Sequence, residues 1–420
     1  MLNELSKKVI VAHPGRQHSF RLATALKKNN MLLYYVTTIY NKDKSLILKF
    51  AQLFLSKDNL KRANSRKNSF LNDSDVIQYC ELRGLIEALL IRIDKSHHLY
   101  RFMQRRDSDI FGVKVAKLAI KNKADCVVMY DSNATKGFKY LKEKAPSIKR
   151  ILDVSIVPRP YMKEIYQNEI KNSGNCDLKN ENDYLWNKRL LERCQDEIDN
   201  TDYFIVASNF VKQGLVHCGV NESQIKVVPY GSNVVNDIQY KTHDENKKCR
   251  FLFVGQVNYR KGITYLLDVI SEMTDFADLT VVGSYKENDW FVKKYKSFNN
   301  IHFTGLVTID KMKNIYSEAD VFVIPSFAEG MAQVGIEAMA CGLPIICTYN
   351  SGVADIVNDG GSGFIIPCGD KAALKDKIVW FLNNKSKIGE MGENARNVAT
   401  EFTWESYEKK VVTAINEILN

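Results

Sequence analysis

The stretch from Val321 to Pro344 places the strongest constraint on the fold of this chain. It reads VFVIPSFAEGMAQVGIEAMACGLP. A short apolar run at 321–324 is stopped by Pro325 and a loop of small residues, and a second apolar segment begins near Gln333 and ends at a glycine. Such a run before a proline is typical of a buried strand, and the glycine is typical of a helix end. The pattern predicts a strand, a loop and a helix whose N-terminus faces a site above the sheet.

Two carboxylates flank the start of this helix. Glu329 lies in the loop, and Glu337 follows eight positions later on a helix that is apolar almost all round. A buried carboxylate needs partners, which ligand hydroxyls, a salt bridge or the helix dipole can supply. The free N–H groups at the helix start offer an anion site between the two acids. These candidate donor-binding residues are Gly330, Met331, Ala332, Gln333 and Val334. The arrangement suits a nucleotide sugar, with ribose at one of the two acids, diphosphate in the middle and sugar hydroxyls at the other.

The segment 329–337 resembles the E-x7-E motif of the retaining family 4 glycosyltransferases. The resemblance extends from FVGQVNYRKG at 253 to FIIPCGD at 364, and several separately spaced elements agree in order. It implies the GT-B fold, in which two Rossmann-like domains with parallel sheets face each other across a cleft. It also implies transfer of a sugar from a nucleotide-diphosphate donor to an acceptor hydroxyl, with retention of the anomeric configuration.

A basic pair in the loop that begins at Gly255 is the predicted diphosphate clamp. The family has an arginine directly after this glycine and a lysine before the next one; Lys261 matches, whereas Gln256 replaces the arginine. Arg260 is the candidate that supplies the missing charge, since a guanidinium beside an ammonium can bind two phosphates. Arg260, Lys261 and Glu329 are the candidate catalytic residues, because fixed donors aimed at the leaving diphosphate lower the barrier.

A second ligand-facing loop is predicted near the N-terminus. The apolar run at 9–12 ends in HPGRQH and is followed by a helix pattern. Gly15 corresponds to a family glycine that faces the donor diphosphate, and Arg16 and His18 are candidates for acceptor binding. Asp153, at the end of a later strand, is a third acceptor candidate, although the family has a histidine there. The alternatives are a solvated loop and an ordinary turn aspartate.

The order of predicted elements divides the chain into two units. Strands and helices alternate up to the polar stretch KTHDENKK at 241–248, and the alternation restarts at Phe251. This alternation predicts parallel sheets with helices on both faces. We expect an acceptor-binding domain over 1–240 and a nucleotide-sugar-binding domain over 241–402. As in the family, a final helix in 403–420 is expected to cross back to the first domain.

The net charge of +10 is unevenly distributed along the chain. Residues 1–150 carry 30 Lys and Arg against 13 Asp and Glu, and an apolar segment at 46–55 precedes a basic run at 57–67. Such a segment can lie on an anionic membrane surface. A helix packed on its own domain is the more common alternative. The basic half contains no recognisable nucleic-acid-binding module, so nucleic acid is not an expected partner.

Cysteine usage and hydropathy indicate a cytosolic compartment. The nine cysteines are scattered without C-x-x-C spacing, and no apolar leader precedes the first predicted strand. The longest apolar stretches, such as 85–93, are interrupted by charges and too short to span a bilayer. We therefore expect a cytoplasmic protein that can attach to the inner face of the membrane. Two D-x-D triplets, at 73–75 and 107–109, are interpreted as surface or cap carboxylates, so no metal and no cofactor are expected.

Two other functions remain open on the same scaffold. A sugar-nucleotide epimerase or isomerase would act without an acceptor, and a non-catalytic partner subunit would keep only the fold. Lys261, Glu329 and Glu337 argue against the second, and Gln256 argues slightly for it. The family favours UDP over GDP as the donor nucleotide. The basic first half favours a glycan or lipid-linked glycan acceptor, as in surface polysaccharide assembly.

Overall fold

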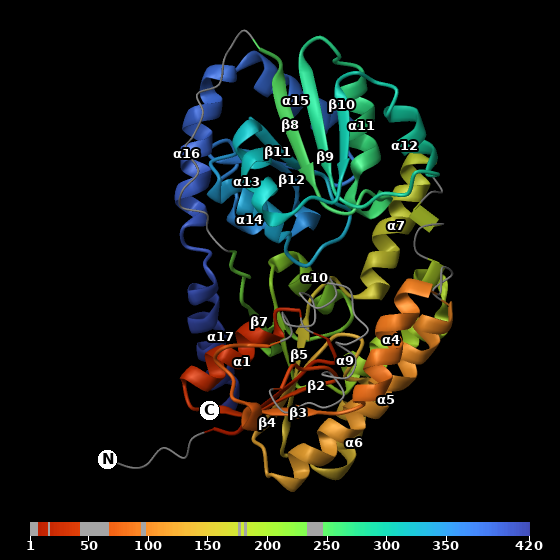
Figure 1. The fold of residues 1–420 in the computed structure, drawn as a ribbon, viewed down its shortest axis with the longest axis vertical. Coiled ribbons are helices and arrows are strands. Elements are labelled where there is room, and N and C mark those ends of the chain that lie inside the picture. The colour runs from red at the N-terminus through yellow and green to blue at the C-terminus, as the bar shows by residue number, and fades with distance from the viewer. Residues whose placement is uncertain are drawn as a thin grey trace.

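The computed structural model describes residues 7–15, 17–42, 67–93, 98–174, 178–179, 183–232 and 247–420. They form two α/β units, which lie one above the other in Figure 1. The predicted boundary at 240/241, the apolar segment 46–55, Arg16 and nearly all of the basic run lie outside the described residues.

The first unit is built on a seven-stranded sheet in the order β3-β2-β1-β4-β5-β6-β7. All of its pairings are parallel, and β1 and β4 are buried along their whole length, as strands covered on both faces require. The strands are β1 (Val9–Ala12), β2 (Leu32–Thr37), β3 (Val76–Gln78), β4 (Cys126–Tyr130), β5 (Lys149–Val154), β6 (Tyr203–Val206) and β7 (Ile225–Val227). The helices are α1 (Ser19–Lys28), α4 (Glu81–Ile93), α5 (His98–Lys121), α6 (Thr135–Lys144), α7 (Arg159–Ser173), α9 (Lys188–Asp199) and α10 (Asn209–His217).

The second unit is built on a six-stranded parallel sheet in the order β10-β9-β8-β11-β12-β13. Its strands are β8 (Cys249–Val254), β9 (Ala277–Val282), β10 (Ile301–Gly305), β11 (Val321–Ile324), β12 (Ile345–Thr348) and β13 (Gly363–Ile366). Its helices are α11 (Ile263–Ser271), α12 (Trp290–Tyr295), α13 (Ile309–Glu318), α14 (Gln333–Ala340), α15 (Lys371–Asn383) and α16 (Ile388–Ala399). The predicted strand at 321–324 and the helix start at Gln333 are confirmed.

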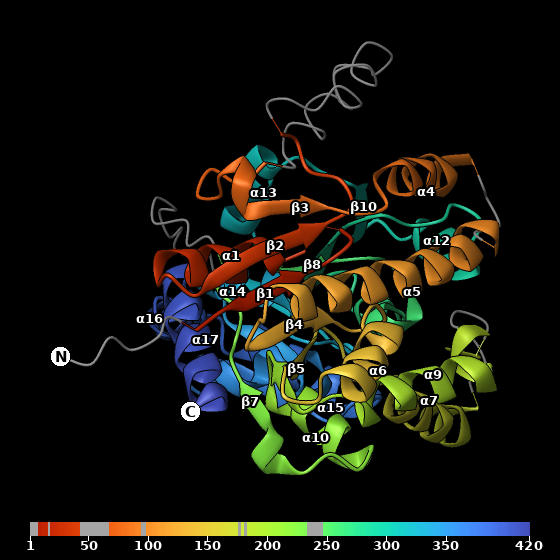
Figure 2. The same ribbon diagram turned by 90° about the horizontal axis from the view of Figure 1, so that it is seen from below.

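The chain returns to the first unit through its last helix, α17 (Trp404–Leu419). The amide of Ser232 donates to the carbonyl of Phe402 (2.9 Å), so the two segments that join the units run side by side. Helix α17 then packs against α1, where Lys28 Nζ lies 2.6 Å from Glu408 Oε2 (Figures 1 and 2). The first unit is therefore completed by residues from the end of the chain.

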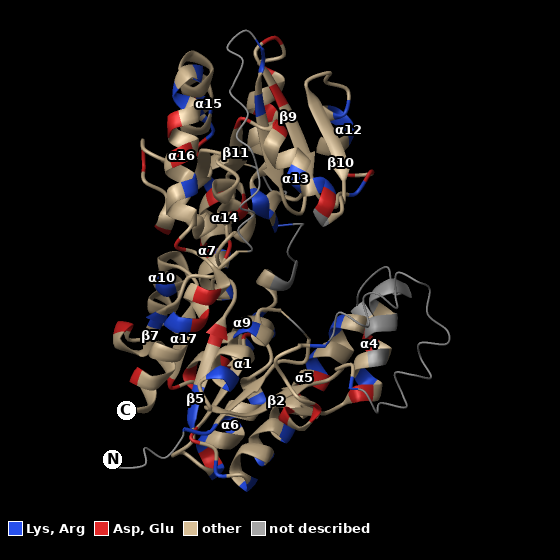
Figure 3. Ribbon diagram, turned by 60° about the vertical axis from the view of Figure 1, so that its left-hand side comes forward, with Lys and Arg blue, Asp and Glu red and all other residues tan. Residues whose placement is uncertain are grey.

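Charged side chains of both signs are spread over the helices of both units (Figure 3). The basic excess of the first 150 residues is thus distributed over several elements. No helix within the described ranges combines the length and the apolarity that crossing a bilayer requires.

The two units touch directly at the loop between β11 and α14. The hydroxyl of Ser208 donates to the carbonyl of Gly330 (2.5 Å), and the amide of Asn209 donates to Asp355 Oδ2 (2.6 Å). A Cβ atom added at Gly330 would lie only 1.9 Å from the carbonyl oxygen of Ser155. This position therefore requires glycine because of the close approach between the units.

We predict that Gly330→Ala opens the contact between the units. A methyl group cannot occupy the space held by a backbone oxygen, so the units must separate, and small-angle X-ray scattering should give a larger radius of gyration. The matched control is Gly305→Ala, where an added Cβ meets nothing within 4 Å. Gly305 has a φ of +73°, so its substitution costs ~1–2 kcal/mol of backbone strain without separating the units. An unchanged radius for Gly330→Ala would contradict the close-contact account.

Candidate functional site

The start of α14 presents a row of backbone amides at the contact between the units. The amide of Glu329 donates to Asn350 O (3.0 Å) and that of Ala332 donates to Ser351 O (3.1 Å). The other amides of the loop and first turn have no hydrogen-bond acceptor among the described residues. They are those of Gly330, Met331, Gln333 and Val334. Unpaired N–H groups at the positive end of a helix form an anion site.

Two cations converge on Glu329 beside these amides. Its Oε1 atom lies 2.5 Å from Arg260 Nη1 and 2.7 Å from Lys261 Nζ. Arg260 also donates to the carbonyl of Ala328 (2.8 Å), which holds the guanidinium against the loop. Burial lowers the pKa of the Lys261 ammonium, and the charge of Glu329 opposes this shift. The cluster carries one net positive charge within a largely desolvated site.

A glycine lets the basic pair reach this position. Arg260 and Lys261 lie on a single 3₁₀ turn (Tyr259–Lys261) that Asn258 caps, and Gly262 ends it with a φ of +67°. A Cβ at Gly262 would lie 1.9 Å from the carbonyl oxygen of Pro325, directly after β11. The turn is therefore packed against the end of the strand that leads to Glu329.

Of the remaining donor-site candidates in the second unit, Gly255 lies beside this cluster and Glu337 contacts a different helix. Gly255 follows β8, and a Cβ added there would lie 3.4 Å from the Cε atom of Lys261. Gln256, which replaces the family arginine, is exposed. Glu337 lies one helical stretch further on, where it accepts a hydrogen bond from the Tyr316 hydroxyl (3.2 Å). Burial raises the pKa of Glu337, and this hydrogen bond opposes the shift.

Two acceptor-site candidates of the first unit lie together at the ends of its strands. His18 Nε2 lies 2.9 Å from Asp153 Oδ2, and the Asp153 side chain is almost fully buried. Tyrosine rings surround His18, at centroid distances of 5.1 Å for Tyr130, 4.4 Å for Tyr230 and 6.3 Å for Tyr407. The three tyrosine hydroxyls are buried and have no hydrogen-bond partner among the described residues. Sequence reasoning missed these tyrosines, which come from three distant segments.

The buried histidine of the same loop was also missed. Nδ1 of His13 accepts a hydrogen bond from the amide of Gly15 (2.8 Å), and this fixes the turn after β1. Burial lowers the pKa of the His13 imidazole to about 4, so the ring is neutral at physiological pH. The position of His13 directly after a predicted strand, in the sequence HPG, was the signal that could have identified it as a residue of the turn.

The two D-x-D triplets bind basic side chains. Asp75 pairs with Lys27 (2.7 Å), Asp107 with Arg83 (2.5 Å) and Asp109 with Arg193 (2.6 Å). Within the described part of the chain, no group of three or more His, Cys, Asp or Glu residues is arranged to hold a metal ion.

Comparison with known proteins assigns the second unit. Residues 235–398 match the family model described as glycosyl transferases group 1. This segment belongs to that family. The uncharacterized glycosyltransferase MJ1178 of Methanocaldococcus jannaschii is 31% identical over 209 residues, which are 49% of this chain and 57% of the relative. The capsular polysaccharide biosynthesis glycosyltransferase CapM of Staphylococcus aureus is 28% identical over 260 residues, 56% of this chain and 66% of the relative. This chain thus matches less than two thirds of either relative's length.

A solved structure identifies the fold of the whole chain. The structure of Anabaena Alr3699/HepE in complex with UDP aligns with a TM-score of 0.60 and 14% identity, over 98% of this chain and all of that one. With two parallel sheets in two α/β units, this protein has the GT-B fold, and the predicted fold class is confirmed.

We predict that the buried His13 makes the free energy of unfolding of this protein fall in mild acid. Between pH 6.5 and about 4, the unfolded chain binds a proton at His13 that the folded chain does not, so stability decreases as the pH falls through this range. The loss is ~2 kcal/mol at pH 5. Urea unfolding at pH 7 and pH 5 measures it.

In this experiment His13→Asn should reduce the difference between the free energies of unfolding at pH 7 and pH 5, because the asparagine side chain does not titrate. His302→Asn removes an exposed histidine and serves as the matched control, which should behave as the wild type. Equal pH dependence in the wild type and His13→Asn would show that His13 is not responsible.

Proposed function

We propose that this protein is a retaining glycosyltransferase that moves a sugar from a nucleotide-diphosphate donor to an acceptor hydroxyl. The observation that carries the proposal is the convergence of Arg260 and Lys261 on Glu329 beside the unpaired amides of α14. The cations and amides are the donors that a diphosphate needs, and the carboxylate is the acceptor that sugar hydroxyls need.

Donor binding in this proposal exchanges one anion for another. The diphosphate lies across the start of α14 and replaces Glu329 as the partner of Arg260 and Lys261. The released Glu329 then accepts hydrogen bonds from the donor sugar and orients its anomeric carbon, and Glu337 holds the ribose. A diphosphate would also oppose the lowering of the Lys261 pKa by burial, as the charge of Glu329 does.

The chemical step depends on stabilising the leaving group. Negative charge builds on the diphosphate as the bond from the anomeric carbon to oxygen breaks, and the fixed positive charges lie where that charge develops. Each such donor is worth ~2.7–4 kcal/mol of the barrier. The departing phosphate oxygen takes the proton of the acceptor hydroxyl on the same face of the sugar. Direct contact between the units at Gly330 excludes water from the donor.

The substrates are assigned by likeness. UDP is the proposed donor nucleotide, with GDP second, since the HepE structure contains UDP. A glycan or lipid-linked glycan is the proposed acceptor, in line with the name of CapM. Residues 1–240 would bind the acceptor, 241–402 the donor, and the final helix in 403–420 would tie the two together. Catalysis would need neither a metal nor a cofactor. We place the enzyme in the cytoplasm, on the inner face of the membrane.

We predict that Lys261→Ala and Glu329→Ala each reduce turnover by more than about tenfold while the fold is retained, since each removes a group that contacts the donor. Release of nucleotide diphosphate measures turnover and also excludes an epimerase, which releases none. Lys286→Ala, in an exposed loop of the same unit, is the control and should keep full activity. Near-normal turnover in both site variants would refute the assignment.

We predict that UDP raises the melting temperature, because a ligand that binds only the folded state at 100 times its Kd adds ~2.7 kcal/mol of stability. Arg260→Gln should lose most of this effect because it removes a phosphate contact. Glu329→Gln should retain it, because the variant frees both cations, although turnover still falls. Differential scanning fluorimetry gives the comparison. Loss of the UDP effect in Glu329→Gln together with its retention in Arg260→Gln would reverse the proposed roles.

A further inference from the structure

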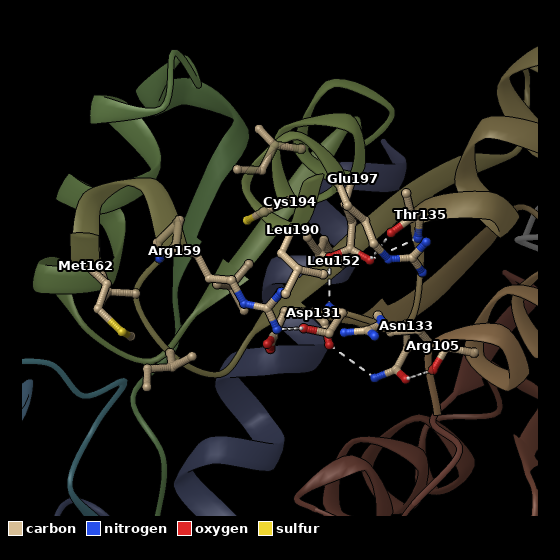
Figure 4. Close-up of a pocket in the computed structure, with 18 of the residues that line it drawn as sticks. Arg105, Asp131, Asn133, Thr135, Leu152, Arg159, Met162, Leu190, Cys194 and Glu197 are labelled. Carbon is tan, nitrogen blue, oxygen red and sulfur yellow. Dashed lines mark hydrogen bonds between the residues drawn. The ribbon is translucent and has the colours of Figure 1, made fainter. Parts of the chain in front are cut away.

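A cavity of about 310 Å³ lies inside the first unit, between α5, α7, α9 and the strand ends of β4 and β5 (Figure 4). Its volume falls at the lower end of the range of small-molecule sites, about 300 to 1,000 Å³. Its floor is apolar, and the side chains that form the floor are Leu152, Val154, Met162, Leu190 and Leu215.

The cavity shares a wall with the candidate donor site. Asp131 lines it, and its Oδ1 atom accepts hydrogen bonds from the amide (2.9 Å) and the hydroxyl (2.5 Å) of Ser155. The carbonyl of Ser155 is the group that lies against Gly330, next to Glu329. Ser155 therefore separates a molecule in the cavity from the loop that holds the proposed donor.

Both carboxylates that line the cavity accept hydrogen bonds from other groups of the protein. Glu197 accepts hydrogen bonds from the amides of Ser132 (2.8 Å), Ala134 (2.7 Å) and Thr135 (2.9 Å), so its carboxylate caps the start of α6. The carboxylate of Asp131 is held by Ser155. Burial raises the pKa of Asp131, and the charge of Arg159 is among the effects that oppose this shift, so Asp131 partly compensates that arginine.

Four arginines line the same cavity. Arg193 is held in a two-bond pair with Asp109, and Arg159 donates to the hydroxyl of Ser132 (3.3 Å). Arg101 and Arg105, on one face of α5, are exposed and have no ion-pair partner among the residues that the structure describes. The mouth of the cavity thus carries uncompensated positive charge above an apolar floor.

We propose that this cavity binds an anionic sugar as the acceptor, with its carboxylate or phosphate on Arg105 and Arg159 and its ring over the apolar floor. A planar guanidinium matches both anions, because two parallel N–H groups meet two oxygens. The inference rests on the proposed glycosyl transfer and adds the charge class of the acceptor. Neither Arg105 nor Arg159 belongs to the basic pair that contacts Glu329.

The test measures binding of defined sugars to the full-length protein by ligand-observed NMR titration. The probes are D-glucuronate, D-glucose 1-phosphate, neutral methyl glucoside and inorganic phosphate. The variant is Arg105→Gln, which changes an exposed side chain on α5. The matched control is Arg106→Gln, since Arg106 is the exposed neighbour that does not line the cavity. The UDP-induced rise in melting temperature is measured on all three proteins.

We expect the charged sugar that fits best to bind the wild type and Arg106→Gln alike and Arg105→Gln about tenfold more weakly or worse, as for loss of a charge-assisted hydrogen bond. Preference for glucuronate identifies a carboxylate, and preference for glucose 1-phosphate identifies a phosphate. The inference is overturned if the charged sugars bind Arg105→Gln as tightly as the wild type. It is also overturned if methyl glucoside or inorganic phosphate binds the wild type as tightly as the charged sugars do. If UDP still stabilises the proteins, the proposed function survives that result. If UDP stabilises none of the three proteins, the proposed function is wrong, and the acceptor assignment, which rests on it, is wrong as well.

Discussion

The ion cluster of Arg260, Lys261 and Glu329 is the interaction on which the site depends. It joins the turn after β8 to the loop after β11, two segments 69 residues apart in the chain. Three charges removed from water are costly unless they satisfy one another, and here one carboxylate oxygen meets two cations. The cluster holds the basic turn beside the open amides of α14. In the proposed reaction a diphosphate would meet positive charge already in place, which is the condition for electrostatic catalysis.

Close backbone contacts determine where this cluster lies. Gly262 brings the basic turn against Pro325, and Gly330 brings the loop against Ser155 of the other unit. The same loop thus belongs to the candidate donor site and to the contact between the units. Helix α17 adds a second connection, because it packs on α1 and supplies Tyr407 to the rings around His18. Movement of one unit relative to the other would therefore displace the loop that carries Glu329.

The two units contribute different chemistry. The second unit offers a helix N-terminus, two cations and a carboxylate, a set suited to a diphosphate and the hydroxyls attached to it. The first unit offers the buried pair of His18 and Asp153 and, beside it, an arginine-lined cavity with an apolar floor. The carboxylate of Asp131 lines that cavity and accepts a hydrogen bond from the amide of Ser155. The carbonyl of Ser155 lies against Gly330, so this residue connects the cavity to the candidate donor site. In the proposed reaction the donor and the acceptor would bind on either side of this connection.

The sequence by itself determined the local elements and the order of the motifs. The strand at Val321–Ile324 and the start of α14 at Gln333 follow from apolar spacing and end signals within short windows. Helix α7 was not predicted, and it begins between Pro158 and Pro160 because prolines are compatible with a first helical turn. Only the tertiary structure decided that His18 meets Asp153, 135 residues away, and that Glu329 binds both cations. Such pairs depend on how the sheets and helices pack, and that packing is not encoded in any single window of the chain.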